Sequence, residues 1–307
     1  MMAGMRVVLT GGTGVIGHAA VPALVAAGHE VVLAVRKDSS HGADLPGTRR
    51  VVDLFDVDSL VEAFEGADAA INLATRIPVG YAAVRPGAWR RNDELRTFGA
   101  ANVATAATRA GVRRVIQESV SFVYADAGDH WISEDDPVDI TVATEPVAVA
   151  EASAQEYAGP ARAGVVLRFG MIVGAEPQTM STLRGAGHGR PIGLGDPDGW
   201  AHLVHTDDLG SAVVAALQAP TGVYNVGATP VRKREATAAF AQVAGVDRVS
   251  FIGPVLQRLA GARLEPLARS LRVSSRRFSA ATGWRPSRPV FGVEWLEGAM
   301  ELQASNE

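Results

Sequence analysis

The sequence predicts an α/β protein with one doubly wound parallel sheet and a small C-terminal lobe. Short runs rich in valine and isoleucine alternate with alanine-rich amphipathic stretches through the first 170 residues, and this alternation is typical of β-α-β units. Glycine, proline and short segments then replace the pattern, and helical, basic sequence follows residue 230. Because 47% of its 307 residues are hydrophobic, the chain can bury a large core.

Each expected strand is a short apolar run, and each expected helix joins two of these runs. We expect strands at residues 6–10, 30–36, 49–53, 69–73, 114–118, 164–168 and 222–225. We expect helices at residues 15–27, 57–64, 93–110 and 148–158. Connections of this length are crossover helices, so the strands should run parallel with right-handed connections.

A glycine-rich turn between the first strand and the first helix predicts a dinucleotide site. Its glycines have the spacing G-x-x-G-x-x-G. The first permits a tight turn, the second lets backbone amides approach a pyrophosphate, and the third allows close packing of the helix. The helix N terminus adds partial positive charge for the phosphates. The predicted phosphate-binding loop comprises Gly11, Thr13, Gly14, Val15, Ile16 and Gly17.

The end of the second expected strand predicts the choice of cofactor. It carries Arg36 and Lys37 and no acidic residue. An acid at this place holds the ribose hydroxyls of NAD, whereas a basic residue accommodates the 2′-phosphate of NADP. We therefore expect NADP, with NAD as the alternative. Two solvated surface charges are the other interpretation of this pair.

These patterns divide the chain into two parts. Residues 1–170 should form an NAD(P)-binding domain of the Rossmann type, to which residues 204–228 return. Residues 171–203 and 229–307 should combine into a small substrate-binding lobe. The lobe is expected to cap the carboxyl edge of the sheet, where ligands bind in such folds.

Composition excludes several classes of partner. The net charge of −4 gives no electrostatic reason to expect nucleic acid or an anionic membrane. Cysteine is absent, which removes disulfides, thiolate nucleophiles and cysteine-ligated metals. No apolar stretch reaches the roughly eighteen residues of a membrane span, and the first apolar run is already a strand, which leaves no room for a signal peptide. We expect a cytoplasmic protein.

Two histidines late in the chain do not predict a metal site. His202 and His205 lie three residues apart in an extended stretch, so they point to opposite faces and cannot chelate one ion. Asp207 and Asp208 precede a helical pattern, where an acid is expected as the N-terminal cap.

Seven segments in order make the chain resemble the extended, atypical short-chain dehydrogenases/reductases of the NAD-dependent epimerase/dehydratase type. The matching segments are TGGTGVIG, VVDLFD, INLAT, GVRRVIQESVSFVYAD, VVLRFGMIVG, LVHTDDLGSAVVAAL and GVYNVG. The resemblance implies that Asp53 contacts adenine with Leu54 beside it. It implies that Leu73, Ala74 and Thr75 line the cofactor. It also suggests a homodimer through helices of the fourth and fifth regions.

The resemblance fails at the residues that normally move protons. Counted back from Glu156, the Tyr-x-x-x-Lys pair of the family falls on Ala148 and Ala152. Alanine can neither exchange a proton nor hold the nicotinamide ribose. The supporting asparagine of the family falls near Arg96, and Asn92 lies one turn earlier on the same expected helix face.

Other polar residues near the end of the fifth strand are therefore the catalytic candidates. Counted from Tyr124, the serine or threonine of the family falls on Val120, flanked by Ser119 and Ser121. We expect Ser119, Ser121 and Tyr124 to polarise a substrate oxygen. Glu118 should act as a general base if burial raises its pKa. A structural role is the alternative for each.

The segment before His205 argues against a nucleotide-sugar substrate. Members of the family that bind nucleotide sugars carry an Arg-Asp pair there, and the arginine grips the diphosphate. This chain has Ala201 and His202 instead, so the bidentate phosphate clamp is missing. We expect a smaller, non-nucleotide organic substrate, for example from secondary metabolism.

These features lead to one hypothesis and two alternatives. The first is an NAD(P)-dependent oxidoreductase that reduces a carbonyl or conjugated bond with a non-standard proton donor. The second is an isomerase, dehydratase or cyclase on the same fold, with no net redox change. The third is a non-catalytic NADP(H) sensor, which the polar groups Gln117, Glu118, Ser119 and Ser121 at the expected pocket floor disfavour.

Overall fold

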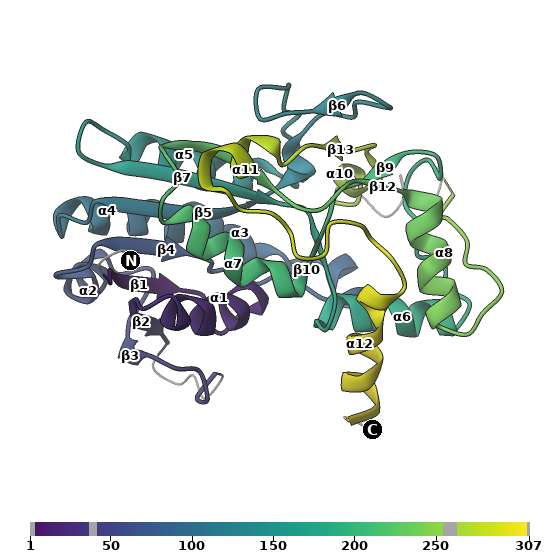
Figure 1. Ribbon diagram of the computed structural model, residues 1–307, viewed down its shortest axis with the longest axis horizontal. Coiled ribbons are helices and arrows are strands. Elements are labelled where there is room, and N and C mark those ends of the chain that lie inside the picture. Colours follow the sequence, from purple (N-terminus) through teal and green to yellow (C-terminus); the bar gives the residue numbers. More distant parts are fainter. Residues whose placement is uncertain (1–3, 37–41, 254–262, 306–307) are drawn as a thin grey trace.

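The computed structural model describes residues 4–36, 42–253 and 263–305, and a seven-stranded parallel sheet organises them (Figure 1). The strand order is β11-β7-β5-β4-β1-β2-β3, with every neighbouring pair parallel. The chain moves outward from β1 to β3 and then returns to β4 on the other side of β1. This reversal creates a switch point at the carboxyl ends of β1 and β4, where ligands bind in doubly wound folds. The predicted fold class is confirmed.

The seven expected strands all form, and each end lies within two residues of its expected position. They are β1 (Arg6–Thr10), β2 (Glu30–Val35), β3 (Thr48–Val51), β4 (Ala69–Asn72), β5 (Arg114–Val120), β7 (Ala163–Phe169) and β11 (Gly222–Val226). Strand β5 continues beyond its expected end because Ser119 and Val120 still pair with β7. Glu118 therefore lies inside the strand and not at its end. Strand β3 stops at Val51, so Asp53 lies in the turn that follows.

Six short strands form three further ladders outside the central sheet. They are β6 (Trp131–Ile132), β8 (Met171–Val173), β9 (Trp200–Ala201), β10 (Leu203–His205), β12 (Val231–Arg232) and β13 (Arg272–Val273). They pair as β8 with β10, β9 with β12 and β6 with β13. None of these six is among the strands expected from the sequence, since each has only two or three residues.

Helices cover both faces of the central sheet. The helices of the sheet are α1 (Val15–Ala26), α2 (Val57–Phe64), α3 (Arg90–Glu94), α4 (Ala100–Arg109), α5 (Glu145–Tyr157) and α7 (Thr206–Ala216). Helices α1 and α7 pack on one face, and α2, α4 and α5 pack on the other. The helix expected at residues 93–110 runs through α3 and α4 with a π-helical turn, η2 (Leu95–Gly99), between them. Two short 3₁₀ segments are η1 (Gly80–Val84) and η3 (Ser121–Val123).

A separate group of helices packs beside the carboxyl ends of the strands, at the right of Figure 1. The group consists of α6 (Pro177–Gly187), α8 (Lys233–Val243) and α12 (Glu294–Ser305). Two further helices follow α8, namely α10 (Glu265–Ala268) and α11 (Arg276–Thr282), and α11 packs against β11 through Phe278. A third apolar cluster joins Leu183 of α6, Ala239 of α8 and Trp295 of α12. Two stretches that lie far apart in the sequence, before and after β11, thus share one small core.

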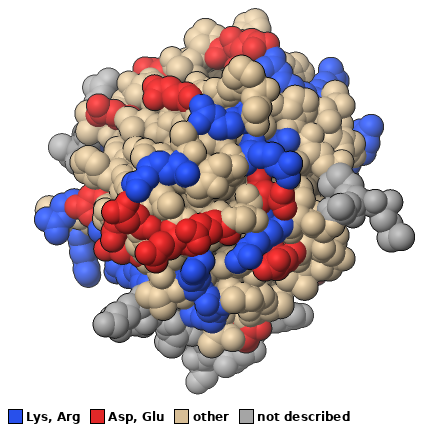
Figure 2. All heavy atoms as spheres, turned by 90° about the vertical axis from the view of Figure 1, so that its left-hand side faces the viewer, with Lys and Arg blue, Asp and Glu red and all other residues tan. Residues whose placement is uncertain are grey.

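The surface at the left of Figure 1 carries both signs of charge. Figure 2 shows acidic and basic side chains interspersed on this face. At the amino ends of the strands, Arg113 pairs with Asp68 at 2.5 Å and Arg6 with Glu30 at 3.6 Å. In the part of the chain that the structure describes, no helix has the length and apolar character needed to cross a membrane.

Candidate active site

The glycine loop after β1 packs backbone against backbone. Gly11 has a φ of 74°, and a Cβ on it would lie 2.4 Å from the carbonyl carbon of Leu73. A Cβ on Gly17 would lie 2.5 Å from the carbonyl oxygen of Gly11. Side chains are therefore excluded from the turn at both positions, and the start of helix α1 lies directly behind it.

The start of helix α1 is open to an anion. Its N-cap is Gly14, which offers no side-chain cap, and the first turn contains no acidic residue. The first backbone bond of the helix joins His18 N to Gly14 O at 2.9 Å, so the amides before it have no partner within the helix. A bare helix N terminus behind a side-chain-free turn fits the diphosphate of a dinucleotide.

A row of buried hydrogen bonds fixes the end of β4 beside this loop. Thr10 Oγ1 donates to Asn72 Oδ1 at 2.6 Å, and Asn72 Nδ2 donates to Gln117 Oε1 at 2.8 Å. The amide of Ala74 also donates to Asn72 Oδ1, at 3.2 Å, and Leu73 N donates to the carbonyl of Thr10 at 3.0 Å. The structure thereby places Leu73 and Ala74 against the glycine loop, and Thr75 follows them in the chain.

The residues expected near the adenosine follow β2 and β3. Arg36 comes directly after β2 and is exposed, while Lys37 lies outside the described residues. Asp53 is also exposed, and its Oδ1 accepts the amide of Phe55 at 2.9 Å. The carbonyl of Leu54 accepts Asn102 Nδ2 at 3.1 Å, which ties the turn after β3 to helix α4.

Glu118 forms a buried ion pair. Arg96 Nη2 donates to Glu118 Oε1 at 2.8 Å, and the two residues are 2% and 3% exposed. The sequence left a general base and a structural hydrogen-bond acceptor as alternatives for Glu118, and one oxygen of its carboxylate is held by a guanidinium. The other oxygen, Oε2, and Arg96 Nη1 have no hydrogen-bond partner among the described residues.

Arg96 comes from the π-helical turn η2. Such turns insert one extra residue into a helix and occur frequently at functional sites. One turn earlier, Asn92 Oδ1 accepts the amide of Arg76 at 3.1 Å and so supports the segment after β4. Asn92 therefore supports the backbone of the segment after β4, whereas the Arg96 side chain pairs with Glu118.

Ser119 belongs to a second buried network. Its hydroxyl donates to Glu151 Oε1 at 2.5 Å, and Glu151 also receives Nε and Nη2 of Arg168 at 2.8 and 2.6 Å. Burial alone would lower the pKa of Arg168, but the hydrogen bonds and charge of Glu151 outweigh burial and raise that pKa. The bidentate pair fixes the Glu151 carboxylate, which in turn holds the Ser119 hydroxyl between β5 and α5.

Counting back from Glu156 puts the Tyr-x-x-x-Lys positions of the family on Ala148 and Ala152, but other residues of α5 face the sheet. Val147 and Glu151 are buried, whereas Ala148 and Ala152 are only partly buried. Glu156, from which the count starts, is exposed. The position that contacts β5 is therefore one residue earlier, and it carries a carboxylate. The chain still has no tyrosine and lysine pair on this helix face.

Tyr124 and Ser121 are enclosed in different surroundings. The Tyr124 side chain packs with Ile132, Leu271 and Val273, and its hydroxyl donates to Asn225 Oδ1 at 2.8 Å. Burial raises the pKa of this hydroxyl. This packing differs from the expected contact with substrate. Ser121 is fully buried, and its hydroxyl has no partner within the described ranges.

Comparisons with known proteins identify the family. The NAD dependent epimerase/dehydratase family matches residues 7–227. The chain belongs to this family. The 3-diazoavenalumate denitrifying reductase of a Streptomyces species is 30% identical to this family member, over 96% of this chain and 99% of the relative. As a family member the chain is an oxidoreductase- or epimerase-like enzyme, and the resemblance inferred from the seven motifs is confirmed.

Two solved structures show the same fold as this epimerase/dehydratase family member. The human epimerase family protein SDR39U1 (isoform 2), solved with NADPH, has a TM-score of 0.79 and 26% identity, covering 96% of this chain and 99% of that one. The Bordetella bronchiseptica enzyme WbmG, solved with NAD, has a TM-score of 0.76 and 20% identity, covering 99% and 95%.

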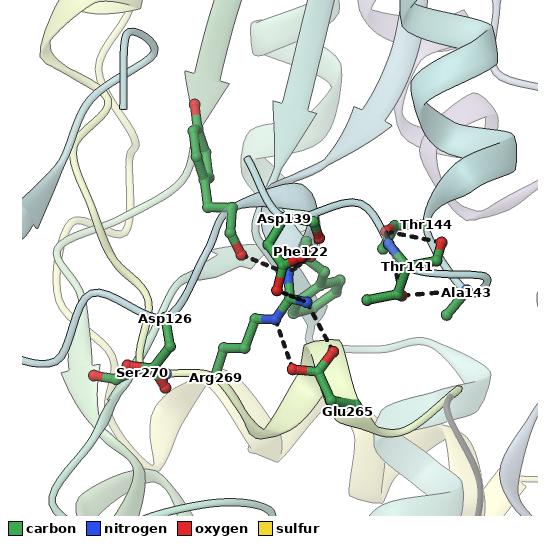
Figure 3. A network of polar contacts seen from close by, with 10 residues as sticks. Phe122, Asp126, Asp139, Thr141, Ala143, Thr144, Glu265, Arg269 and Ser270 are labelled. Carbon is green, nitrogen blue, oxygen red and sulfur yellow. Dashed lines mark hydrogen bonds and ion pairs between the residues drawn. The ribbon is translucent and has the colours of Figure 1, made fainter. Parts of the chain in front are cut away.

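A buried arginine from the C-terminal part of this family member holds the loop after β5 (Figure 3). Arg269 Nη1 donates to the carbonyls of Tyr124 at 2.7 Å and Asp139 at 2.8 Å. Its Nε and Nη2 donate to the carboxylate of Glu265, and Nη2 also reaches Asp139 Oδ2. No local sequence pattern predicts this contact, because it joins residues 145 positions apart.

The late histidines of this family member serve the packing of β10 and α7. His205 caps α7 by accepting the amide of Asp207 at 3.1 Å, so the cap is not an aspartate as expected. Asp208 instead accepts backbone amides of Ser287 and Arg288. Burial lowers the pKa of His202 to about 3. In the described ranges, no three histidine, aspartate or glutamate side chains group in a way that could hold a metal ion.

Proposed function

We propose that this enzyme uses NADP(H) to reduce a small, non-nucleotide organic substrate by hydride transfer. The observation that carries the proposal is the side-chain-free glycine loop, which packs on Leu73 and leaves the start of α1 open. The nicotinamide would supply the hydride. Exposed Arg36 after β2 supports NADP over NAD, and the human relative was solved with NADPH.

The two residues before β10 carry no positive charge, and this disfavours a nucleotide sugar as the substrate. His202 is neutral near pH 7, since burial lowers its pKa to about 3. Neither it nor Ala201 provides the cation that a diphosphate requires. A small substrate with little negative charge suits this position better.

The lack of a dedicated proton donor narrows the substrate class further. Reduction of a carbonyl creates an alkoxide, which needs an acid nearby. Among the buried residues of α5, Val147 carries no acid and Glu151 is paired with Arg168. The nearby tyrosine hydroxyls are also engaged, since Tyr157 donates to the carbonyl of Val112 and Tyr124 donates to Asn225. Reduction of an aryl diazonium replaces dinitrogen by hydrogen and creates no oxyanion. The Streptomyces relative is named as a denitrifying reductase of a diazo compound, so we propose an aryl diazo compound as the substrate.

Reduction of a carbonyl or enone is the second candidate. The buried, unpartnered hydroxyl of Ser121 at the start of η3 favours it, because such a hydroxyl would polarise a substrate oxygen. A homodimer and a cytoplasmic location remain predictions from the sequence.

The proposal is tested by binding and then by turnover. NADPH should bind the purified chain more tightly than NADH. With NADPH deuterated at the transferred position, an aryl diazonium should give dinitrogen and deuterium on the ring carbon. Oxidation of NADPH by carbonyls or enones alone would select the second candidate. Tight binding without oxidation by either panel would favour the redox-neutral or sensor alternatives.

A substitution in the glycine loop tests the observation that carries the proposal. Gly17→Ala places a Cβ 2.5 Å from the Gly11 carbonyl, so the loop must shift and NADPH affinity should fall by about a hundredfold or more. Gly185→Ala in α6 is the matched control, because its Cβ would only meet a side-chain methyl group at 3.8 Å. Unchanged NADPH affinity in Gly17→Ala would contradict a diphosphate site at this loop.

A further inference from the structure

Three buried polar atoms at the carboxyl end of β5 lack a partner among the described residues. They are Arg96 Nη1, Glu118 Oε2 and Ser121 Oγ. Each belongs to a residue that is 3% exposed or less. Folded proteins satisfy nearly all buried polar side-chain atoms with protein, water or a ligand. These three atoms therefore require partners that the described residues do not supply.

The ion pair fixes what kind of group that molecule presents. Arg96 Nη2 and Glu118 Oε1 bind each other at 2.8 Å. This leaves one guanidinium donor beside one carboxylate acceptor. Because the two charges offset each other, the pair favours a neutral ligand over an ion. Two neighbouring hydroxyls match this arrangement, one accepting from Arg96 and the other donating to Glu118.

The position of β5 in the sheet selects one half of the cofactor. The phosphates belong at the β1 loop, and the adenosine side extends over β2 and β3, where Arg36 and Asp53 lie. Strands β4 and β5 lie on the other side of β1, so they receive the nicotinamide half of a dinucleotide. The ribose of this half carries two neighbouring hydroxyls.

The two lysines of the sequence do not account for the binding of this ribose. The chain contains Lys37, which follows β2, and Lys233. Lys233 Nζ donates to the carbonyls of Leu194, Leu267 and Ala268 in the C-terminal part. The ribose must therefore be held by other groups.

We propose that Arg96 and Glu118 bind the two hydroxyls of the nicotinamide ribose. Arg96 donates through Nη1 and Glu118 accepts through Oε2. The inference rests on the proposed function, because it requires a nicotinamide dinucleotide at the switch point. The inference also assigns a role to the π-helical turn η2, because this turn carries Arg96, which pairs with Glu118.

The first experiment removes both groups at once. Replacing a buried ion pair by apolar residues of similar size often preserves folding, whereas removing one partner strands a charge. The double variant Arg96→Met/Glu118→Leu should bind NADPH about tenfold more weakly or worse, as the loss of two hydrogen bonds implies. Its affinity for adenosine 2′,5′-bisphosphate, which lacks the nicotinamide half, should stay within about twofold. Calorimetry measures both.

A matched control lies at the other end of the same strand. Arg114 is partly buried, and its Nη1 donates to the carbonyl of Ala219 at the amino edge of the sheet. Arg114→Met should leave the ratio of the two affinities unchanged. Unchanged NADPH affinity in the double variant, or equal weakening of both ligands at an unchanged melting temperature, would overturn the inference.

The second experiment changes the ligand and keeps the protein intact. An NADPH analogue with both hydroxyls removed from the nicotinamide ribose should bind the unaltered chain about tenfold more weakly than NADPH. Equal affinity would overturn the inference even if the double variant fails to fold. If NADPH itself does not bind the unaltered chain, the proposed function fails first.

Discussion

At the scale of single residues, Arg36 is the charge that should decide between the two nicotinamide cofactors. It is exposed directly after β2, where a 2′-phosphate would lie. Arg36→Glu should weaken NADPH binding by about tenfold or more and leave NADH binding nearly unchanged, as fluorescence titration would show. Arg113→Glu, at the amino edge of the sheet, makes the same change in net charge and should affect neither. Equal loss of both cofactors in Arg36→Glu would contradict a preference for NADP.

His202 should make the stability of the protein depend on pH. Burial lowers its pKa from 6.5 to about 3, so below pH 6.5 the unfolded chain takes up a proton that the folded chain refuses. As the pH is lowered from 6.5 to 3, the free energy of unfolding should therefore fall by up to about 1.4 kcal/mol per pH unit. His202→Leu should flatten this dependence in urea unfolding, and exposed His188→Leu should not. Parallel curves for parent and His202→Leu would refute the argument.

At the scale of elements, Arg269 connects the C-terminal part to the loop after β5. Its guanidinium serves two carboxylates and several carbonyls, more partners than a lysine ammonium can satisfy. Arg269→Lys should lower the free energy of unfolding by about 2–4 kcal/mol. It should also speed hydrogen exchange in η3 while the NADPH affinity stays the same.

Exposed Arg276→Lys is the control for this change, with no expected effect on either measurement. If η3 exchanged as slowly in Arg269→Lys as in the parent, Arg269 would not be what holds this loop.

The elements that the sequence predicts well are those with a regular pattern. Apolar runs locate all seven strands of the sheet, and helix α2 has the expected bounds. The end of β5 is placed two residues early because the polar residues from Gln117 to Ser119 interrupt the apolar run, although backbone pairing with β7 continues to Val120. The π-helical turn η2 is missed because one inserted residue hardly alters a 3.6-residue period.

In the candidate site too, the local motif can be predicted from the sequence and the long-range contacts cannot. The glycine loop is predictable because its chemistry lies within seven consecutive residues. The partners of Glu118, Ser119 and Tyr124 come from residues 22, 32 and 101 positions away. Such contacts depend on how α5, η2 and β11 pack, and no local pattern contains them.

At the scale of the whole molecule, an apolar surface on η2 and α5 agrees with the expected homodimer. Phe98 is 65% exposed, and Val149 of α5 is also exposed. An open hollow of about 520 Å³, lined among others by Trp89 and Phe98, adjoins this surface and includes no predicted site residue. Exposed apolar groups that gather on one face are typical of an interface between protein chains.

Phe98→Asp should therefore shift the chain from dimer to monomer in sedimentation or light scattering. Val290→Asp is the control, because Val290 is equally exposed but lies before α12. A monomeric parent, or a Phe98→Asp variant that remains dimeric, would place the contact elsewhere or remove it.

The small core shared by α6, α8 and α12 has a consequence for how specificity can change in this lineage. Its two contributing stretches are separated by α7 and β11, which belong to the central sheet. A single genetic crossover would carry only one of them and leave the other with foreign packing partners. We propose that this region binds the substrate, and on that proposal new substrates should be acquired by point substitutions within it, and not by exchange of a ready-made module.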